Sequence, residues 1–199
     1  DSRKFMIKSY LHNEPLTYDG TQLRSHFAYQ TFGIQGDSIV AFMGPCDVRG
    51  DHLVDLEDSK QNLFIHSENM LHFIVEHFDG DLIRTIAFQR LLVDLMIQEI
   101  TDSYDTVETS GRTSLRLIRR GNDNYDDIYK LNVSVATRSP VSCLIHTGIN
   151  ISSKNTPVPT KGLEDYDLNP NALATGVMNR YRAEMEGIWR ARSKVKGVK

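Results

Sequence analysis

Residues 70–100 change from a strand pattern to a helix pattern within a few positions. The stretch MLHFIVEHF at 70–78 is rich in aromatic and branched side chains, which favours a buried strand, and DGD ends it. Asp81 is then a good N-cap, and helical spacing predicts a long, mostly buried helix at about 82–100. The positions that recur at this spacing are Leu82, Ile83, Ile86, Ala87, Arg90, Val93, Ile97 and Ile100. A chain with this pattern at its centre is expected to combine a sheet with helices.

Strand patterns on both sides of this pair extend the expected sheet. SIVAFM at 38–43 is a compact apolar run between the turn-forming segments QGD and GPC. After the helix, strand patterns occur at 113–119, 128–137 and 141–151. The segment GNDNYDD is expected to be a loop, and RSP a tight connection between the last two strands.

The C-terminal part reads as a loop followed by a helix. Residues 152–168 contain prolines and polar residues, which is typical of a loop, and Asn169 followed by Pro170 predicts a helix start. The apolar side of this helix contains Leu173, Val177, Tyr181, Met185, Ile188 and Trp189. We therefore expect one α+β domain at 6–192, with a mixed, largely antiparallel sheet flanked by helices, and a basic tail at 193–199.

The composition is that of an ordinary globular protein. Of the 199 residues, 40% are hydrophobic and 25% are charged, and the net charge of −3 provides no overall basic field for nucleic acid. Two cysteines, Cys46 and Cys143, favour a reducing compartment. No apolar run approaches the roughly 20 residues of a membrane span, and the charged opening lacks a signal-peptide core. We expect a cytoplasmic protein that binds a small-molecule ligand, with no membrane and no nucleic acid as its main partner; a homo-oligomer stays open.

A lysine in the segment IYKLNVSVAT is the main candidate for chemistry. Alternation along a strand would place Lys130, Asn132 and Ser134 on one polar face, with the branched residues between them facing the core. A turn centred on residue 139 would put His146 opposite Asn132 and Gly148 opposite Lys130. These residues would form a polar patch for a ligand carboxylate or phosphate. The structural alternative is a solvated lysine at a strand end and a histidine fixed within the sheet.

The whole chain is similar to a known but functionally unassigned family. The stretches LRSHFAY, GIQGDSIVAFMGPCDV, HLVDLED and MLHFIVEHFD resemble domain-of-unknown-function family 366, which occurs in archaea and bacteria. This resemblance implies no activity.

Residues 112–151 also resemble the core of the biotin and lipoate protein ligases and octanoyl transferases. Those enzymes carry an Asn-Asp pair in a loop, then a lysine at the start of a strand, then a glycine and an asparagine at the end of a second strand. Asn122 and Asp123 match the pair, and Lys130 matches the lysine. The resemblance implies an architecture shared with class II synthetases and a catalytic Lys130 that contacts an acyl carbonyl and phosphate. The candidate ligand-binding residues that match its motif are Asn122, Asp123, His146, Gly148 and Asn150, and the loop and strand reading adds Arg120 and Asn132.

The sequence also departs from the ligase pattern. The glycine- and arginine-rich loops under which the ligases hold an adenylate are absent, and MGPCDVRGDHLVDLEDS at 43–59 takes their place. The glycine that normally follows the lysine is missing, and no cysteine follows Cys143, where octanoyl transferases need one. These departures argue against ATP-dependent activation of biotin or lipoate, and a related acyl or nucleotide ligand stays open. The cofactors that the resemblance implies are ATP and Mg²⁺.

The loop at 43–59 gathers acidic residues. Because carboxylates can hold Mg²⁺, Asp55, Glu57 and Asp58 are candidate metal ligands, but their spacing matches no established metal motif, and a solvated acidic loop is the alternative. Cys46 is a poor nucleophile candidate because acidic neighbours would raise the pKa of its thiol. The basic tail is either a solvated end or an RNA contact.

The leading functional hypothesis is a ligase or acyltransferase-like enzyme with Lys130 at the electrostatic centre of an acyl or acyl-phosphate pocket. A fixed cation there would stabilise the negative charge that builds on oxygen in the transition state. The alternatives are a non-catalytic binding or assembly protein on the same scaffold and an RNA-associated protein.

Overall fold

A five-stranded sheet forms the centre of the computed structural model, which describes residues 7–61, 63–106 and 115–198. The strand order is β1 (Lys8–Leu11), β2 (Ser38–Val48), β3 (Ile65–His77), β8 (Cys143–Asn150) and β7 (Asn132–Arg138). β1 is parallel to β2, and all other neighbours are antiparallel. The predicted α+β class, with a mixed and largely antiparallel sheet, is confirmed.

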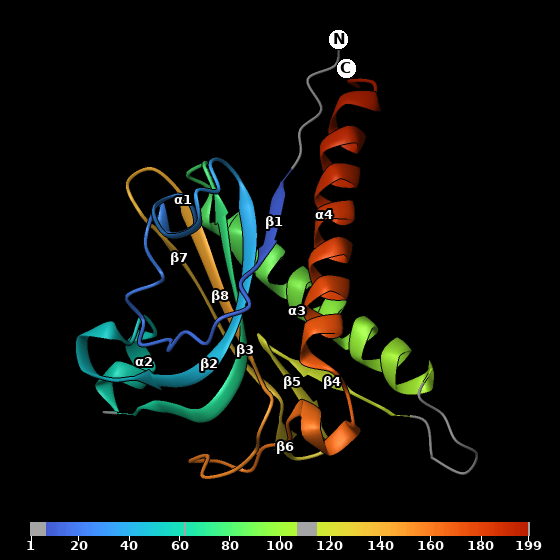
Figure 1. Ribbon diagram of the computed structural model, residues 1–199. Coiled ribbons are helices and arrows are strands. Elements are labelled where there is room, and N and C mark those ends of the chain that lie inside the picture. Colours follow the sequence, from blue (N-terminus) through green and yellow to red (C-terminus); the bar gives the residue numbers. More distant parts are fainter. Residues whose placement is uncertain (1–6, 62, 107–114, 199) are drawn as a thin grey trace.

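Two long helices, α3 (Leu82–Thr106) and α4 (Pro170–Lys194), cover one face of this sheet (Figure 1). Both begin at the predicted caps, because Arg84 N donates to Asp81 Oδ1 at 2.9 Å and Ala172 N donates to Asn169 Oδ1 at 3.0 Å. α3 continues beyond its predicted end at 100, and α4 extends into the predicted tail.

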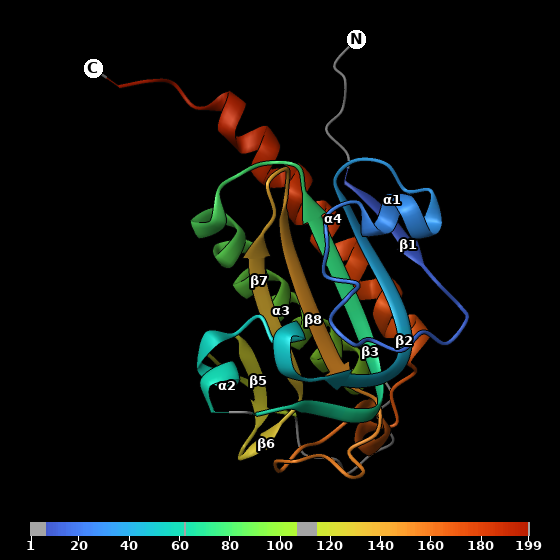
Figure 2. The same ribbon diagram turned by 90° about the vertical axis from the view of Figure 1, so that its left-hand side faces the viewer.

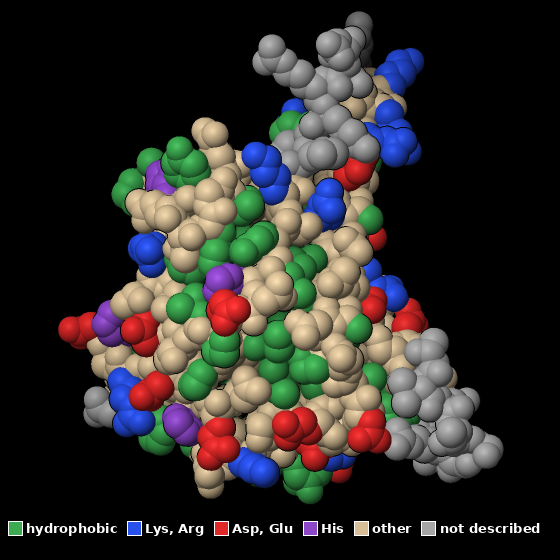
Figure 3. Space-filling model, viewed as in Figure 1, with side chains coloured by type: hydrophobic (Ala, Val, Ile, Leu, Met, Phe, Trp, Pro, Cys, Tyr) green, Lys and Arg blue, Asp and Glu red, His purple; other side chains and the backbone are tan. Residues whose placement is uncertain are grey.

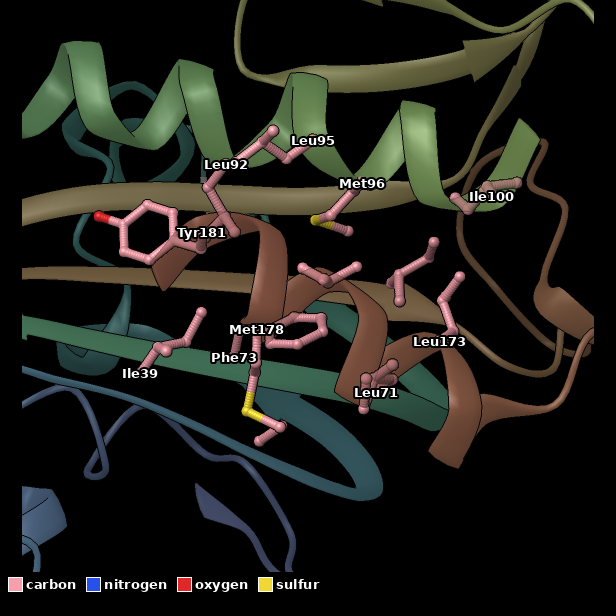
Figure 4. Close-up of a cluster of buried hydrophobic side chains, with 14 of the residues drawn as sticks. Ile39, Leu71, Phe73, Leu92, Leu95, Met96, Ile100, Leu173, Met178 and Tyr181 are labelled. Atoms are coloured by element: carbon pink, nitrogen blue, oxygen red, sulfur yellow. The ribbon is translucent and has the colours of Figure 1, made fainter. Parts of the chain in front are cut away.

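The main core lies between these two helices and the sheet (Figure 4). Its largest fully buried side chains include Ile39, Leu71, Phe73, Leu92, Met96, Ile100 and Tyr181. Since each such burial stabilises the fold by about 1.5–3 kcal/mol, this layer fixes the sheet against the helices.

The predicted inward faces of both helices need correction. In α3, Leu82 and Ile83 are exposed, whereas the polar residues Thr85 and Gln89 are buried. A pattern of apolar residues does not select them. They can be buried because each has a hydrogen-bond partner: Thr85 Oγ1 donates to the carbonyl of Asp81, and Gln89 Nε2 donates to Ser134 Oγ at 2.9 Å. In α4, Ile188 and Trp189 are each 40% exposed, because the last turns of the helix extend past the sheet (Figure 1).

The opposite face of the sheet is covered by the chain between β1 and β2, which includes α1 (Phe27–Phe32), and by the segment after β2 (Figure 2). That segment holds a short 3-10 turn, Gly50–His52, and α2 (Leu56–Lys60). The side chains that form this second cluster include Tyr18, Phe27, Phe42, Leu53, Met70 and Ile74.

A second, three-stranded sheet follows α3, with β5 (Asp123–Asp126) between β4 (Ile118–Arg120) and β6 (Tyr129–Lys130). The predicted loop at GNDNYDD is therefore wrong. The strand predicted at 113–119 begins outside the described residues, and within them only Ile118–Arg120 is strand.

The single strand predicted at 128–137 is also wrong, because it breaks at Leu131 into β6 and β7. Leu131 N donates to the carbonyl of Asn124, and the Leu131 carbonyl accepts from Asn150 N, both at 2.9 Å. Leu131 thus links the small sheet to the large one.

The predicted register between β7 and β8 is wrong as well. Val133 lies opposite Gly148, and Val135 lies opposite His146. Ser139 explains the difference: its hydroxyl accepts from Val141 N and Ser142 N and closes a wider turn than the predicted one. The predicted faces also change, because Ser134 contacts α3 while Val133 and Val135 lie on the opposite face.

Strand β2 continues past its predicted end. It runs through Gly44 and Pro45 to Val48, with a shift in its pairing to β3 between Gly44 and Cys46. Such a bulge accommodates a proline, which has no N–H for the ladder.

On the face shown in Figure 3, lysines and arginines gather near the end of α4, and acidic side chains, with a few basic ones among them, lie at the opposite end. Across the described ranges, no helix combines the length and the apolar character that a bilayer crossing requires.

Candidate functional site

A cavity of about 570 Å³ opens at one end of the large sheet. The elements around it, α2, β5, β6 and the start of β7, lie together in Figure 2. Its wall contains apolar side chains, among them Val48, Leu53, Ile65, Met70, Val133 and Val135. It also contains polar side chains, among them Arg120, Asn122, Asp123, Lys130, Asn132 and Asn150. Pockets of this size and mixed lining are typical of small-molecule sites.

Lys130 forms an ion pair inside this cavity. Lys130 lies opposite Tyr125 in β5, and because side chains alternate along a strand, Asp123 lies on the same face as Tyr125. Lys130 Nζ is 2.7 Å from Asp123 Oδ2, and the two side chains are 26% and 22% exposed. Burial raises the pKa of Asp123, the ammonium of Lys130 opposes this, and the charge of Asp58 adds to the rise. An ammonium has three N–H donors, and Nζ has no other partner among the described residues, so two donors are available to a ligand.

The backbone around Lys130 is fixed by the proline-containing segment at 156–161. Lys130 N donates to the carbonyl of Pro159 at 3.0 Å, and its own carbonyl accepts from Lys161 N at 3.1 Å. This pairing brings Thr156, Pro157, Val158 and Thr160 into the cavity wall. The sequence shows these residues only as a loop, because the pairing depends on contacts distant in the chain.

Buried asparagines hold the Asn-Asp segment in place. Asn132 Oδ1 accepts from Asn124 N at 2.6 Å, and Asn132 Nδ2 donates to the carbonyl of Asn122 at 3.4 Å. Asn124 Nδ2 donates to the carbonyl of Val93 in α3 at 3.0 Å. The position of Asp123 is thus tied to β7 and α3. Sequence reasoning missed Asn124, although it is the third polar residue of GNDN.

The remaining predicted polar residues occupy different parts of the cavity wall. Arg120 is exposed, and its guanidinium lies 5.0 Å from the ring centre of Tyr125. Asn122 Oδ1 accepts from Arg90 Nε at 3.3 Å. Asn150 is buried, with its N–H bound to Leu131.

His146 and Gly148, in contrast, do not line this cavity. His146 Nε2 is 3.1 Å from His72 Nδ1, the other nitrogen of His72 is 3.1 Å from the carbonyl of Gly44, and the ring of Tyr18 stacks on His146 at 3.7 Å. Burial lowers the pKa of both histidines, that of His72 to about 4. A Cβ on Gly148 would lie 3.1 Å from the Cε of Met70, so this glycine makes room for protein side chains. The predicted patch of Lys130, Asn132 and His146 is therefore corrected: the histidine belongs to the packed face of the sheet.

The acidic residues of the loop at 43–59 have different places in the structure: some line the cavity, and one of them caps a helix. Asp55 Oδ1 accepts from Glu57 N at 2.8 Å and from Asp58 N at 3.3 Å, so Asp55 caps α2. Asp55 and Asp58 line the cavity, and Glu57 does not. In the part of the chain that the structure describes, no three histidine, cysteine, aspartate or glutamate side chains form a metal-binding group. Burial raises the pKa of the Cys46 thiol to about 12, which leaves it a poor nucleophile.

Comparison with known proteins identifies the family. The sequence profile of the domain of unknown function DUF366 matches residues 7–196. The chain belongs to the DUF366 family. An uncharacterized protein from Methanocaldococcus jannaschii is 37% identical over 181 residues, which cover 88% of this chain and 78% of the relative. The structure of a protein of unknown function from Pyrococcus horikoshi has a TM-score of 0.86 and 32% identity, covering 96% of this DUF366 chain and all of the other.

More distant solved structures share the fold of this DUF366 protein. The biotin protein ligase from Aquifex aeolicus, in complex with biotin and ATP, has a TM-score of 0.53 and 14% identity, covering 92% of this chain and 73% of the ligase. A T. acidophilum protein described as a candidate lipoate protein ligase, with bound lipoic acid, has a TM-score of 0.50 and 13% identity, covering 90% and 86%. The ligase-like architecture is thereby confirmed at the level of fold.

Phosphate sites in proteins use free backbone N–H groups or basic side chains. In this DUF366 cavity the first N–H groups of α2 are already bound by Asp55, and the side chain of Asp58 adds a carboxylate to the wall. The basic side chains in the wall are Arg120 and Lys130, so a phosphoryl group would have to be bound by these two.

Proposed function

We propose that this DUF366 protein is a ligase-like enzyme or ligand-binding relative that holds an acyl or acyl-phosphate small molecule in the 570 Å³ cavity. The observation that carries the proposal is the ion pair of Lys130 and Asp123, 2.7 Å apart, in a cavity whose wall also contains apolar side chains. Such a pocket matches a ligand with a carbon chain and one polar reacting end.

Lys130 has the properties that acyl chemistry requires. Its side chain is only 26% exposed, so the charge on its ammonium is screened less than that of a surface lysine. Asp123 holds Nζ in position, and the two remaining N–H donors can bind the oxygen of an acyl or phosphoryl group. Negative charge on that oxygen increases as the carbonyl is attacked, and a fixed ammonium then stabilises the transition state more than the ground state.

The fold supports the same kind of ligand. The distant structural relatives include a ligase with bound biotin and ATP and a protein with bound lipoic acid. Biotin and lipoic acid are both small molecules with an acyl chain. Their identity to this chain is 14% or less, so the support concerns the scaffold, and the residues of the cavity carry the rest of the proposal.

Thermal unfolding with a ligand panel tests the proposal. The panel contains biotin, lipoate, octanoate, octanoyl-adenylate and ATP, each with and without Mg²⁺, and is applied to the wild type and to Lys130→Ala. A ligand at 100 times its Kd stabilises the fold by about 2.7 kcal/mol, which is easily measured as a rise in Tm. We expect at least one acyl compound to raise the Tm of the wild type but not that of Lys130→Ala. Equal shifts in both proteins would contradict the proposal. Binding without turnover would favour the non-catalytic alternative.

A further inference from the structure

Tyr18 contributes a buried polar group to the wall of the cavity. The residue is only 3% exposed, and its hydroxyl has no hydrogen-bond partner among the described residues. A buried tyrosine hydroxyl usually has such a partner, because leaving the donor unpaired costs free energy. The cavity thus contains a donor that a ligand can pair.

Contacts within the protein fix both the backbone and the ring of Tyr18. Its N–H donates to the carbonyl of Pro45 at 2.9 Å, and its carbonyl accepts from Asp47 N at 3.0 Å. The ring stacks on that of His146, with 3.7 Å between the ring centres and 11° between the planes. The hydroxyl is therefore held in place before any ligand binds, which lowers the entropic cost of binding to it.

The rings around the hydroxyl of Tyr18 are uncharged. Burial raises the pKa of this hydroxyl, and Cys46 and Asp19 add to the rise, so it is a protonated donor at neutral pH. The histidines that stack against it, His72 and His146, are neutral because burial lowers their pKa. An anion at this place would be buried without a cation, which costs much more than burying a neutral acceptor.

Tyr18 and Lys130 lie beside different residues of β8. Tyr18 stacks on His146, in the middle of the strand. At its end, Asn150 N donates to the carbonyl of Leu131, the residue that follows Lys130. Because four residues of a strand span about 13 Å, a ligand that contacts both side chains has to extend along the strand.

Two apolar side chains of β7 follow the same direction. Val133 lies opposite Gly148, and Val135 lies opposite His146, the residue on which Tyr18 stacks. Both valines and Tyr18 belong to the cavity wall. A carbon chain that starts at Lys130 can therefore contact the valines on its way to the hydroxyl.

A second polar atom of the wall also lacks a partner. His66 Nδ1 is buried and has no hydrogen bond among the residues that the structure describes. A purely hydrocarbon chain that filled the cavity would leave both this nitrogen and the hydroxyl of Tyr18 unpaired. The wall thus favours a ligand with a polar atom in its chain over a plain fatty acid.

We infer that the ligand of this cavity carries an uncharged hydrogen-bond acceptor in its carbon chain, and that the hydroxyl of Tyr18 donates to this acceptor. The ligand class is an acyl compound with a carbonyl or ether oxygen remote from the acyl group. Tyr18 is then the residue that selects such a compound over a plain fatty acid. The inference rests on the proposed function, because it takes Lys130 to hold the acyl end.

A double-mutant cycle between the protein and the probe tests this inference by calorimetry. Octanoate and decanoate are each compared with ethers in which an oxygen replaces one CH₂ of the chain in turn. The variant Tyr18→Phe keeps the ring that stacks on His146 and removes only the hydroxyl. For at least one ether, we expect the affinity relative to its hydrocarbon counterpart to be about fivefold higher in the wild type than in Tyr18→Phe.

Tyr181→Phe is the matched control. Tyr181 is also a buried tyrosine, but its hydroxyl is 2.8 Å from His77 Nε2, and it lies outside the cavity wall. Tyr181→Phe should lower the Tm and leave every Kd unchanged. Tyr18→Phe should leave the Tm of the protein without ligand equal or higher, because no hydrogen bond is lost. Equal falls in Tm for the two variants would assign a structural role to the hydroxyl of Tyr18 and overturn the inference.

The outcomes separate this inference from the proposed function. If the fatty acids bind, Lys130→Ala weakens them and no ether distinguishes the wild type from Tyr18→Phe, the inference is wrong and the acyl pocket stands. If one ether is preferred equally in both proteins, another group of the wall holds its oxygen and the assignment to Tyr18 is wrong. If neither the fatty acids nor the ethers bind, the inference is wrong and the proposed function loses its support as well.

Discussion

Gly44 in β2 lies directly against the backbone of Leu16. A Cβ built on Gly44 would be 2.2 Å from the carbonyl oxygen and 2.7 Å from the carbonyl carbon of Leu16. Leu16 N donates to the carbonyl of Met43 at 2.9 Å, so the close approach is held by a hydrogen bond next to the glycine. This contact fixes the chain before α1 against the sheet.

Gly44→Ala should therefore destabilise the protein by about 2 kcal/mol or more, because the methyl group meets backbone that cannot move without losing that bond. Urea unfolding at neutral pH measures the effect. Gly187→Ala in α4 is the control: a Cβ there meets nothing within 4 Å, and alanine should stabilise this helix by up to about 1 kcal/mol. Equal stability of Gly44→Ala and the wild type would refute the packing argument.

The two stacked histidines predict a loss of stability in acid. Burial lowers the pKa of His72 to about 4 and that of His146 well below its ordinary value of 6.5, so both rings are neutral in the folded protein. Between pH 6.5 and about 4 the unfolded chain takes up protons that the folded chain does not. The free energy of unfolding should then fall with decreasing pH, by at most about 1.4 kcal/mol per pH unit for each histidine.

Urea titrations at pH 7, 6, 5 and 4.5 measure this slope. The double variant His72→Gln/His146→Gln should show a smaller slope than the wild type, while His12→Gln, at a partly exposed position, should keep the wild-type slope. The burial argument fails if the slope is unchanged in the double variant.

Asn132 should position the cavity as well as stabilise the fold. Asn132→Ala removes the acceptor for Asn124 N and the donor to the Asn122 carbonyl, so we expect a loss of about 1–3 kcal/mol in stability and weaker binding of octanoate. Asn169→Ala removes the cap of α4, away from the cavity, and should cost about 1 kcal/mol without a change in Kd. If the two variants bind the probe equally well, Asn132 is structural only.

Features set by contacts between residues close in sequence were predictable, and features set by contacts between distant segments were not. The starts of α3 and α4 were predictable because Asp81 and Asn169 cap backbone groups three residues away. The break at Leu131 was not, because it depends on Asn150, which lies in a different strand of the folded sheet. The register of β8 failed for a related reason, since one serine hydroxyl in the turn changed which residues face each other.

Of the candidate site, the part formed by residues close in sequence was predictable, and the part formed by distant segments was not. Asp123 and Lys130 come together because strand pairing within one small sheet brings close neighbours in sequence face to face. His146 depended on a register between two strands, and it lies in the packed face instead. The wall formed by 156–160 and the charge of Asp58 arise from segments that no local pattern connects with Lys130.

The measurement that tests the central claim most directly compares two matched Lys–Asp pairs. Lys161 Nζ is 2.6 Å from Asp126 Oδ2, with side chains 35% and 20% exposed, and it closely resembles the Lys130 pair but does not line the cavity. Calorimetric titration with octanoate would be made on the wild type, Lys130→Ala and Lys161→Ala under the same conditions. We predict that Lys130→Ala weakens binding at least tenfold and that Lys161→Ala leaves the Kd within about twofold of the wild type. Equal affinities in the two variants would contradict the assignment of Lys130 as the centre of the site.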